Sequence, residues 1–425
     1  MEELPDSLDE TYSRMLREIR KPNQGHARRM LQCLVAAVRP LRVAELAEVL
    51  AIDFNAEGTQ KLNPDWRWED HEEAVMSTCS SLVMIVDDKD KSEDGNKDKT
   101  EDSRIVQFSH FSVKEFLMSD RLAEPSREIT NSQYHLQLGP AHAILAQACL
   151  GVLLRLDNRI NRDNIKDFPL ARYAAKHWVD HARFENVSSL IKGEMECLFD
   201  PDKPHFAAWL WIYNKDSDLS MSTTSPEKPE AVPLYYAALF GFRDLTAHLL
   251  AEHPEDVRAE GGYYVTPLHV SARWGNFDGF SLLIDHFPNL EIRGRYNETP
   301  LVGTSYGGNL EIGKRLLDRG ANIDARDEDG WTPLYAATYC GRLEFARMLL
   351  EHGAAINTPA YNGKTPLHAA SREGHVEVVL LLLEYGGDPN VRNKEGKTPS
   401  DLASRSGQEK IVELLSEHDA MSIKE

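Results

Sequence analysis

The chain has 425 residues, which is enough for two or three domains with their own hydrophobic cores. It contains 48 lysines and arginines and 68 aspartates and glutamates, which gives a formal charge of -20. This charge argues against a nucleic-acid partner, because phosphates would be repelled. The 5 cysteines lack paired spacing, and no run of roughly 18 apolar residues occurs. We therefore expect a cytoplasmic protein with no disulfide framework, no zinc knuckle and no membrane span.

The first 25 residues predict one amphipathic helix, because Leu8, Tyr12, Leu16 and Ile19 recur at helical spacing. Residues 26–122 predict a small helical domain that ends in a wing of two strands. The expected elements are helices over residues 31–38, 43–50 and 69–80 and strands over residues 82–86 and 105–108. Arginines at four positions leave open a local basic face on this domain: Arg28, Arg29, Arg39 and Arg42.

Between the two expected strands, residues 87–103 hold almost only charged residues, Ser, Thr and Gly, so we expect a disordered wing tip. Within it, residues 90–101 place oxygen-bearing side chains at the positions of a calcium-binding EF-hand loop. The flanks predict strands instead of helices, and Lys97 stands where an EF-hand has an apolar residue. A solvated charged loop is therefore the expectation.

Residues 123–214 predict a domain of four or five helices, with Trp178, Trp209 and Trp211 as core or docking aromatics. His177 and His181 lie four residues apart, a spacing that could hold zinc, but no third ligand is close in sequence, so we expect an ordinary helix surface. Residues 215–230 are rich in Ser, Thr and Pro and predict a linker.

Four segments carry a resemblance to a known family: Leu4-Pro5-Asp6-Ser7-Leu8, Arg39-Pro40-Leu41, residues 106–117 (VQFSHFSVKEFL) and residues 169–178 (PLARYAAKHW). The first resembles the segment that closes the nucleotide-binding module in fungal-type NACHT signalling NTPases, and the others resemble the winged-helix and helical region that follows this module. The resemblance implies that residues 1–25 are the terminal helix of that module, that residues 26–122 are a winged-helix domain, and that the rest of the module lies before Met1. Because the chain holds no P-loop, we expect no nucleotide and no other cofactor.

The second half of the chain repeats the triplet Thr-Pro-Leu or a close variant of it. Its prolines are spaced 34, 33, 33, 33 and 33 residues apart, at Pro233, Pro267, Pro300, Pro333, Pro366 and Pro399. A period of 33 residues that opens with T-P-L-H is typical of ankyrin repeats, and residues 231–420 resemble a six-repeat ankyrin domain. The expected fold class is therefore mainly α, a winged-helix and helical region followed by an ankyrin-repeat α-solenoid.

One repeat shows the logic of the pattern. Thr332-Pro333 opens a first helix, because proline has no N–H to leave unpaired in the first turn, and Gly341 ends that helix. A second helix follows and stops before Gly353. His269 and His368 occupy the histidine of T-P-L-H, and we expect them to be buried and hydrogen bonded within their repeats.

The binding surface of an ankyrin stack is its concave groove, which is formed by hairpin tips and by residues just before the glycine that ends each first helix. Phe240, Trp274, Tyr306 and Tyr339 are expected to form an aromatic row there, because the fold itself does not demand exposed aromatics. The candidate partner-binding residues are Phe240, Tyr263, Arg273, Trp274, Tyr296, Tyr306, Trp331, Tyr339, Tyr361, Arg372 and Glu373. The alternative is that the helical domain folds back onto these side chains.

Two segments imitate catalytic motifs. Residues 303–307 match the G-x-S-x-G elbow of serine hydrolases around Ser305, and residues 308–315 resemble a P-loop in which Arg315 replaces the magnesium-binding Ser or Thr. The 33-residue register explains the glycines of both segments without any chemistry.

We therefore expect a non-enzymatic protein that binds a protein ligand in its ankyrin groove and has no small-molecule substrate, no metal, no nucleic-acid partner and no membrane contact. The resemblance implies part of an innate-immunity-like or self/non-self signalling receptor. A free-standing ankyrin adaptor is the alternative, and a serine hydrolase using Ser305 is a distant third.

Overall fold

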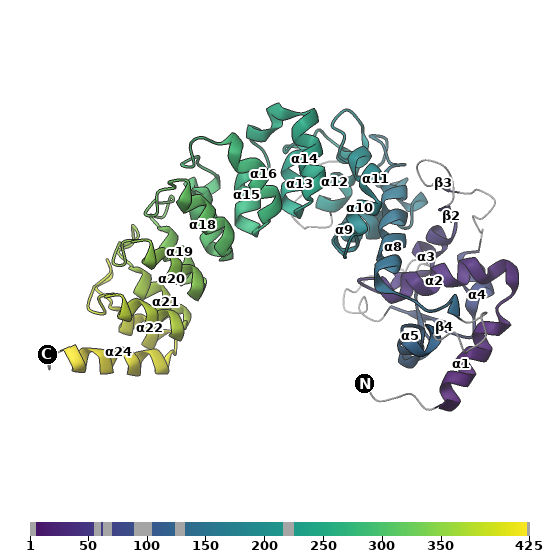
Figure 1. Cartoon of the computed structure of the whole chain (residues 1–425), viewed down its shortest axis with the longest axis horizontal. Helices are drawn as coiled ribbons and strands as arrows, with labels where there is room; N and C mark the ends of the chain where they lie inside the picture. Colours follow the sequence, from purple (N-terminus) through teal and green to yellow (C-terminus); the bar gives the residue numbers. More distant parts are fainter. Residues whose placement is uncertain are drawn as a thin grey trace. The chain divides into compact units, whose positions relative to one another are not determined.

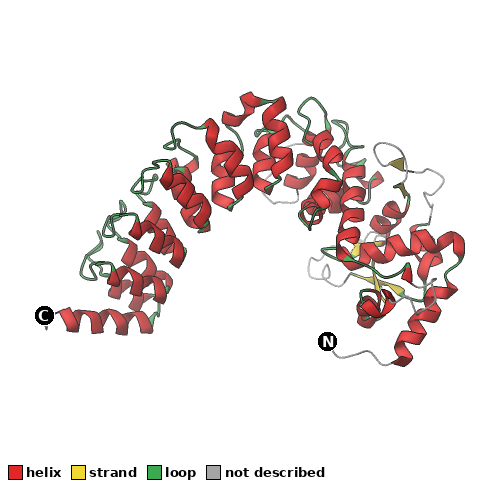
Figure 2. Cartoon of the chain, in the orientation of Figure 1, coloured by secondary structure: helices red, strands yellow, loops and turns green. Residues whose placement is uncertain are grey.

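The computed structural model describes residues 6–54, 61–62, 70–88, 104–123, 132–215 and 225–422. They belong to two compact units, Met1–Pro229 and Glu230–Glu425 (Figure 1). Helices make up most of both units, and the described strands lie in the first one (Figure 2). The expected fold class, mainly α with a winged helix ahead of a solenoid of helix pairs, is confirmed.

Some sequence predictions fall outside the described residues. The wing tip is described only at Asp87 and Asp88, and the EF-hand-like segment 90–101 lies wholly outside. Of the expected linker, residues 216–224 lie outside, as do residues 1–5 at the start of the chain.

The described residues of the winged-helix part form five helices and two small antiparallel sheets in a short stretch of sequence. Its elements are α2 (Gln24–Ala36), β1 (Leu41–Arg42), α3 (Val43–Leu50), β2 (Ile52–Asp53), β3 (Lys61–Leu62), α4 (His71–Cys79), β4 (Val83–Asp87), β5 (Arg104–Phe108), α5 (Phe111–Leu117) and α6 (Asp120–Ala123). The wing strands β4 and β5 pair antiparallel, with Val83 opposite Phe108, as the sequence predicts. β1 adds a third strand in the order β1-β5-β4, which the sequence analysis missed because two residues are too few to show alternation.

Helix α1 (Asp6–Glu18) packs on α5 through the apolar face that its sequence predicts. The Tyr12 hydroxyl is 2.7 Å from Ser112 Oγ, which is in turn 2.6 Å from His110 Nδ1. The Tyr12 and Phe116 rings lie 5.5 Å apart. Because these contacts use side chains of both helices, α1 belongs to the core of the first unit.

The rest of the first unit is helical and is held by aromatic rings. It comprises α8 (Leu138–Leu153), η5 (Ile165–Asp167), α9 (Ala171–Ala182), α10 (Val187–Leu190), α11 (Lys192–Leu198) and α12 (His205–Lys215). Trp178 and Trp209 are buried and meet edge to face at 5.6 Å, and Trp209 Nε1 donates to the Ala175 carbonyl at 3.0 Å. Trp211 is also buried, so these three tryptophans are core residues, one of the two roles expected for them.

The expectation of an ordinary helix surface at His177 and His181 is half wrong. His181 is fully buried, with Nε2 2.9 Å from the Tyr173 hydroxyl and Nδ1 2.8 Å from His142 Nδ1. His177 instead lies 3.1 Å from Asp180. Burial, together with the neighbouring His142, lowers the pKa of His181 to about 3, so the ring stays neutral. The pair does not form a zinc site, because each ring is occupied by another partner.

The second unit is a row of six helix pairs (Figure 1). The first helices are α13 (Pro233–Phe240), α15 (Pro267–Trp274), α17 (Pro300–Gly307), α19 (Pro333–Tyr339), α21 (Pro366–Glu373) and α23 (Pro399–Arg405). The second helices are α14 (Arg243–Glu252), α16 (Phe277–Leu283), α18 (Leu310–Asp318), α20 (Leu343–Glu351), α22 (Val376–Glu384) and α24 (Glu409–Ser422). Each first helix begins with proline, as its sequence predicts.

The histidines of the T-P-L-H motif have the expected structural role. His368 is buried, with Nδ1 2.9 Å from Thr365 Oγ1 and Nε2 3.0 Å from the Lys397 carbonyl. His269 makes the same contacts with Thr266 and Ile292, and burial lowers its pKa to about 4. Each ring therefore ties a helix start to the hairpin of the following repeat.

Helices α18 and α20 approach closely at Gly313. A Cβ added there would lie 2.6 Å from the Phe345 ring and 2.9 Å from Met348 Cε, and Phe345 is buried. We expect Gly313→Ala to lower the free energy of unfolding by about 1–2 kcal/mol, because the clash outweighs the roughly 1 kcal/mol that alanine gains in a helix.

Gly193 in α11 offers the matched control, since nothing lies within 4 Å of its missing Cβ. Gly193→Ala should raise the free energy of unfolding by about 0.4–1 kcal/mol. Urea denaturation followed by circular dichroism measures both changes. Equal, stabilising effects of the two substitutions would mean that α18 and α20 do not meet at Gly313.

Candidate functional site

The candidate groove residues occupy two different positions of the repeat. Two residues before the left-handed glycine that follows each first helix stand Leu239, Arg273, Tyr306, Tyr339, Arg372 and Arg405. One residue before that glycine stand Phe240, Trp274, Gly307, Cys340, Glu373 and Ser406. All six side chains at the first position are half-buried or exposed, and we call this set the groove column. The expected aromatic row therefore mixes two positions, and only Tyr306 and Tyr339 of that row belong to the groove column.

Phe240 does not belong to the exposed surface, which corrects the sequence expectation. It is 9% exposed, and its ring lies 6.3 Å from Phe242. Trp274 is at the equivalent position of the next repeat and is 60% exposed. Phe240 has two ring neighbours, Tyr236 and Phe242, each 6.3 Å away, whereas no such ring contact is described for Trp274.

Four side chains of the candidate region stack across three repeats. The Arg273 guanidinium lies 4.0 Å from the centre of the Tyr306 ring. The Tyr306 and Trp331 rings are 6.1 Å apart, and Trp331 and Tyr339 are 4.9 Å apart. We call Arg273, Tyr306, Trp331 and Tyr339 the stacked strip. All four are half-buried, so they present ring faces and a cation in one continuous surface.

A buried carboxylate that sequence reasoning missed fixes one end of the strip. Glu298 is 3% exposed, and its Oε2 accepts from Arg273 Nη1 at 3.2 Å. Burial raises the pKa of Glu298 to about 7, although Arg273 opposes the rise. Near neutral pH this carboxyl group is therefore protonated for part of the time. When it is protonated, it does not neutralise the positive charge of Arg273, which can then attract an anionic group of a ligand. Glu298 occupies the repeat position that holds Trp331 and Lys364 in the next two repeats. Because the residue type at this position varies, the repeat pattern gives no signal that could have identified Glu298.

The hairpins of the second and third repeats bring two tyrosines together. The hydroxyls of Tyr263 and Tyr296 lie 2.9 Å apart, and Arg295 stacks on the Tyr263 ring at 4.1 Å. Both tyrosines are exposed, as is Tyr361 on a later hairpin. The sequence analysis selected the tyrosines but not Arg295, which holds both rings.

The last repeats add a cationic hollow of about 360 Å³. Its lining residues are Lys364, Arg372, Glu395, Leu402, Arg405 and Ser406. Leu402 is buried, whereas Arg372 and Arg405 are exposed. Glu373, the candidate beside Arg372, lies 3.4 Å from its guanidinium. The hollow thus combines an apolar leucine with three cations and one lining carboxylate.

The serine of the G-x-S-x-G match lies inside helix α17. Ser305 is fully buried, and its Oγ donates to the Leu301 carbonyl at 2.7 Å. The P-loop-like segment begins at Gly308, which is the left-handed residue that ends α17. Neither segment has the strand and turn that its enzymatic motif requires.

Within the described ranges, no group of three or more His, Cys, Asp and Glu comes close enough to hold a metal ion. A search of the same residues finds no helix with the length and apolar character needed to cross a bilayer.

Comparison with known proteins agrees with the two-part architecture. The family model described as ankyrin repeats (3 copies) matches residues 234–327, 288–360, 303–393 and 357–424. The model of the winged helix domain of GPI inositol-deacylase matches residues 12–127. Ankyrin repeats and a winged-helix domain of the GPI-inositol-deacylase type, a NACHT-related region, are therefore present.

The chain is also similar to azaphilone pigments biosynthesis cluster protein L of Monascus ruber, at 28% identity over 299 residues. The similarity covers 66% of this chain and 59% of that protein, so the chain spans about three fifths of the length of this relative.

Proposed function

We propose that this chain is a non-enzymatic recognition protein that holds a protein partner along the groove column and the neighbouring hairpins. The observation that carries the proposal is the stacked strip. Buried leucines and alanines between the helices supply the packing of the repeats, and the strip adds an arginine between half-buried rings that stay partly open to a partner. Aromatic and arginine side chains of this kind are the usual anchors of protein interfaces.

The charges of the surface favour a partner segment that carries carboxylates beside apolar or aromatic side chains. The groove column holds Arg273, Arg372 and Arg405, and Lys364 adds a fourth cation beside them. The chain as a whole has a formal charge of -20, whereas the groove column contains three arginines and no acidic residue. Screening over about 8 Å at physiological salt lets the local cations act on a bound segment despite that net charge.

The first unit supports a regulatory role for the binding event. Its winged-helix domain is of a NACHT-related type, and we propose that the chain works in an innate-immunity-like or self/non-self signalling receptor of that kind. A free-standing adaptor, which would present a client protein to another protein, is the second candidate. The relative supports this candidate, because its name refers to a pigment biosynthesis cluster and not to a receptor. An in-frame P-loop in the genomic sequence upstream of Met1 would favour the receptor.

A peptide selection on the immobilised full chain tests the proposed partner chemistry. We expect the selected peptides to combine Asp or Glu with aromatic or leucine residues, and their affinity to fall at least tenfold when the acids become Asn or Gln. Affinity should also weaken as salt rises from 50 to 500 mM, because ion pairs at this surface are screened. Selected peptides that bind equally well as amides and at high salt would contradict the proposal.

A further inference from the structure

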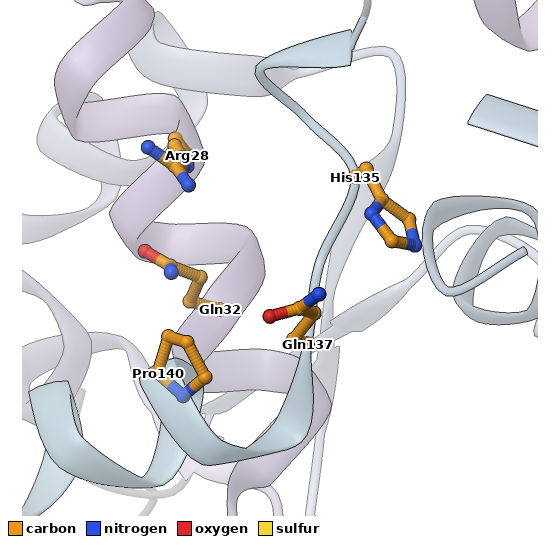
Figure 3. Close-up of a pocket in the computed structure, with 5 residues that line it drawn as sticks. All are labelled: Arg28, Gln32, His135, Gln137 and Pro140. Atoms are coloured by element: carbon orange, nitrogen blue, oxygen red, sulfur yellow. The ribbon is translucent and has the colours of Figure 1, made fainter. Parts of the chain in front are cut away.

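A second hollow lies inside the first unit, between helix α2 and the segment that leads into α8. It has a volume of about 230 Å³ and is lined by Arg28, Gln32, His135, Gln137 and Pro140. In Figure 3, Arg28 and Gln32 come from α2, and the facing segment carries His135 and Gln137. The ring of His135 turns away from α2 in this view, which leaves Arg28, Gln32 and Gln137 as the other polar side chains of the lining.

The facing segment is held by the backbone and by packing. The Leu136 N–H donates to the Leu117 carbonyl at 2.8 Å, and the Leu136 side chain is buried. Helix α2 buries Met30, Leu31 and Cys33 on its other sides. Both walls of the hollow are therefore fixed by the fold.

The polar side chains of the hollow have no partner within the described part of the chain. Gln32 is only 5% exposed as a residue, its amide makes no hydrogen bond there, and its amide atoms are not sealed from solvent. Arg28, one turn earlier on α2, makes no ion pair there, and the Gln137 amide is likewise unpaired. Arg28 and Gln137 are exposed, so all three polar groups can exchange water for a bound molecule. A guanidinium and two amides without protein partners therefore line one hollow and are available to a small guest.

The chemistry of the lining indicates the class of guest. A guanidinium presents a planar fork of donors that matches phosphate and carboxylate oxygens, and amide groups add further donors beside it. No carboxylate is among the described residues that line the hollow, in a chain with 68 acidic residues. The volume is below the roughly 300–1,000 Å³ of pockets for drug-sized ligands, so the guest is small.

We propose that this hollow is a binding site for a small oxyanion, held by Arg28 and by the amides of Gln32 and Gln137. The anionic group is a phosphate or a carboxylate of a small molecule. This site is built from residues of the first unit, so it does not depend on the protein partner proposed for the ankyrin unit.

Calorimetric titration of the full chain with inorganic phosphate tests the site, at an ionic strength kept constant with chloride. A parallel titration with acetate distinguishes the two sources of the oxyanion. We expect saturable binding of at least one of them at one site per chain. Arg28→Gln should weaken it at least tenfold, and Gln137→Glu should abolish it, because a carboxylate at the exposed wall repels the anion.

Arg172→Gln is the matched control, since Arg172 is another exposed arginine of the first unit and does not line the hollow. This variant should bind as the wild type does. Hydrogen exchange should show slower exchange over residues 132–140 when the anion is bound. Absence of binding by both anions, or equal binding by Arg28→Gln and wild type, would overturn the proposal. The hollow would then be a solvent-filled cavity that binds no anion.

Discussion

Replacing Glu48 by alanine should lower the free energy of unfolding of the first unit by about 3 kcal/mol. Glu48 on α3 is 7% exposed, and its carboxylate accepts from the Leu170 N–H at 2.7 Å. Leu170 stands at the N-terminus of α9, where no side chain of that helix itself caps the free N–H groups. A carboxylate at that end satisfies a donor and interacts favourably with the helix dipole.

The second contact of Glu48 strengthens this expectation. Its Oε1 lies 3.5 Å from Arg155 Nη1, and Arg155 also stacks on Phe168. Removing one partner of a buried pair costs about 3–5 kcal/mol, and we take the low end because Arg155 is partly exposed. The loss should appear as a lower urea midpoint by circular dichroism.

Glu115→Ala is the matched control for Glu48→Ala. Glu115 is exposed on α5 and makes no described contact, so its removal should change the free energy of unfolding by less than about 0.5 kcal/mol. If both substitutions cost the same small amount, Glu48 does not join the winged helix to the helical part.

Replacing Arg372 of the groove column, or Trp274 beside Arg273 of that column, by alanine should weaken partner binding by a factor of about 30 for each, equivalent to roughly 2 kcal/mol, and leave the melting temperature nearly unchanged. Trp274 is 60% exposed, and the Arg372 side chain is 50% exposed, so neither supports the core. The measurement is the affinity of each variant for a peptide selected on the wild-type chain. A loss of affinity that comes with a lower melting temperature would mean that these residues hold the fold instead.

The matched control is Tyr385→Ala, because Tyr385 is 39% exposed just after the second helix α22 and is neither in the groove column nor next to one of its residues in sequence. It should leave both affinity and stability close to those of the wild type. Tyr339 is less suitable as a test residue than the sequence suggests, because its ring packs on Trp331 beside the buried Tyr335. Removing it would change binding and stability together.

The periodic part of the fold could be read from the sequence because each repeat uses the same physical devices. Proline at the first turn and a left-handed glycine after the first helix recur at fixed spacing, and they place the helix pairs. The wing strands β4 and β5 were also predictable, because apolar β-formers flank a charged stretch. β1 was not, since a two-residue strand is defined only by its partner β5.

The site was less predictable because exposure depends on neighbours. Phe240 and Trp274 share a repeat position, yet Phe240 lies beside the rings of Tyr236 and Phe242 and is 9% exposed, whereas Trp274 is 60% exposed. Glu298 escaped notice because repeat position alone does not reveal that Arg273 will reach it. The oxyanion hollow joins Gln32 and Gln137, which lie far apart in the sequence, so only the fold brings them together.

The most direct test of partner binding at the groove column is hydrogen exchange of the full chain with and without a selected peptide. We predict slower exchange in the first helices α15, α17, α19 and α21 and in the hairpins around Tyr263 and Tyr296, with little change in the second helices. Protection confined to α16, α18, α20 and α22, or to the first unit, would contradict the account.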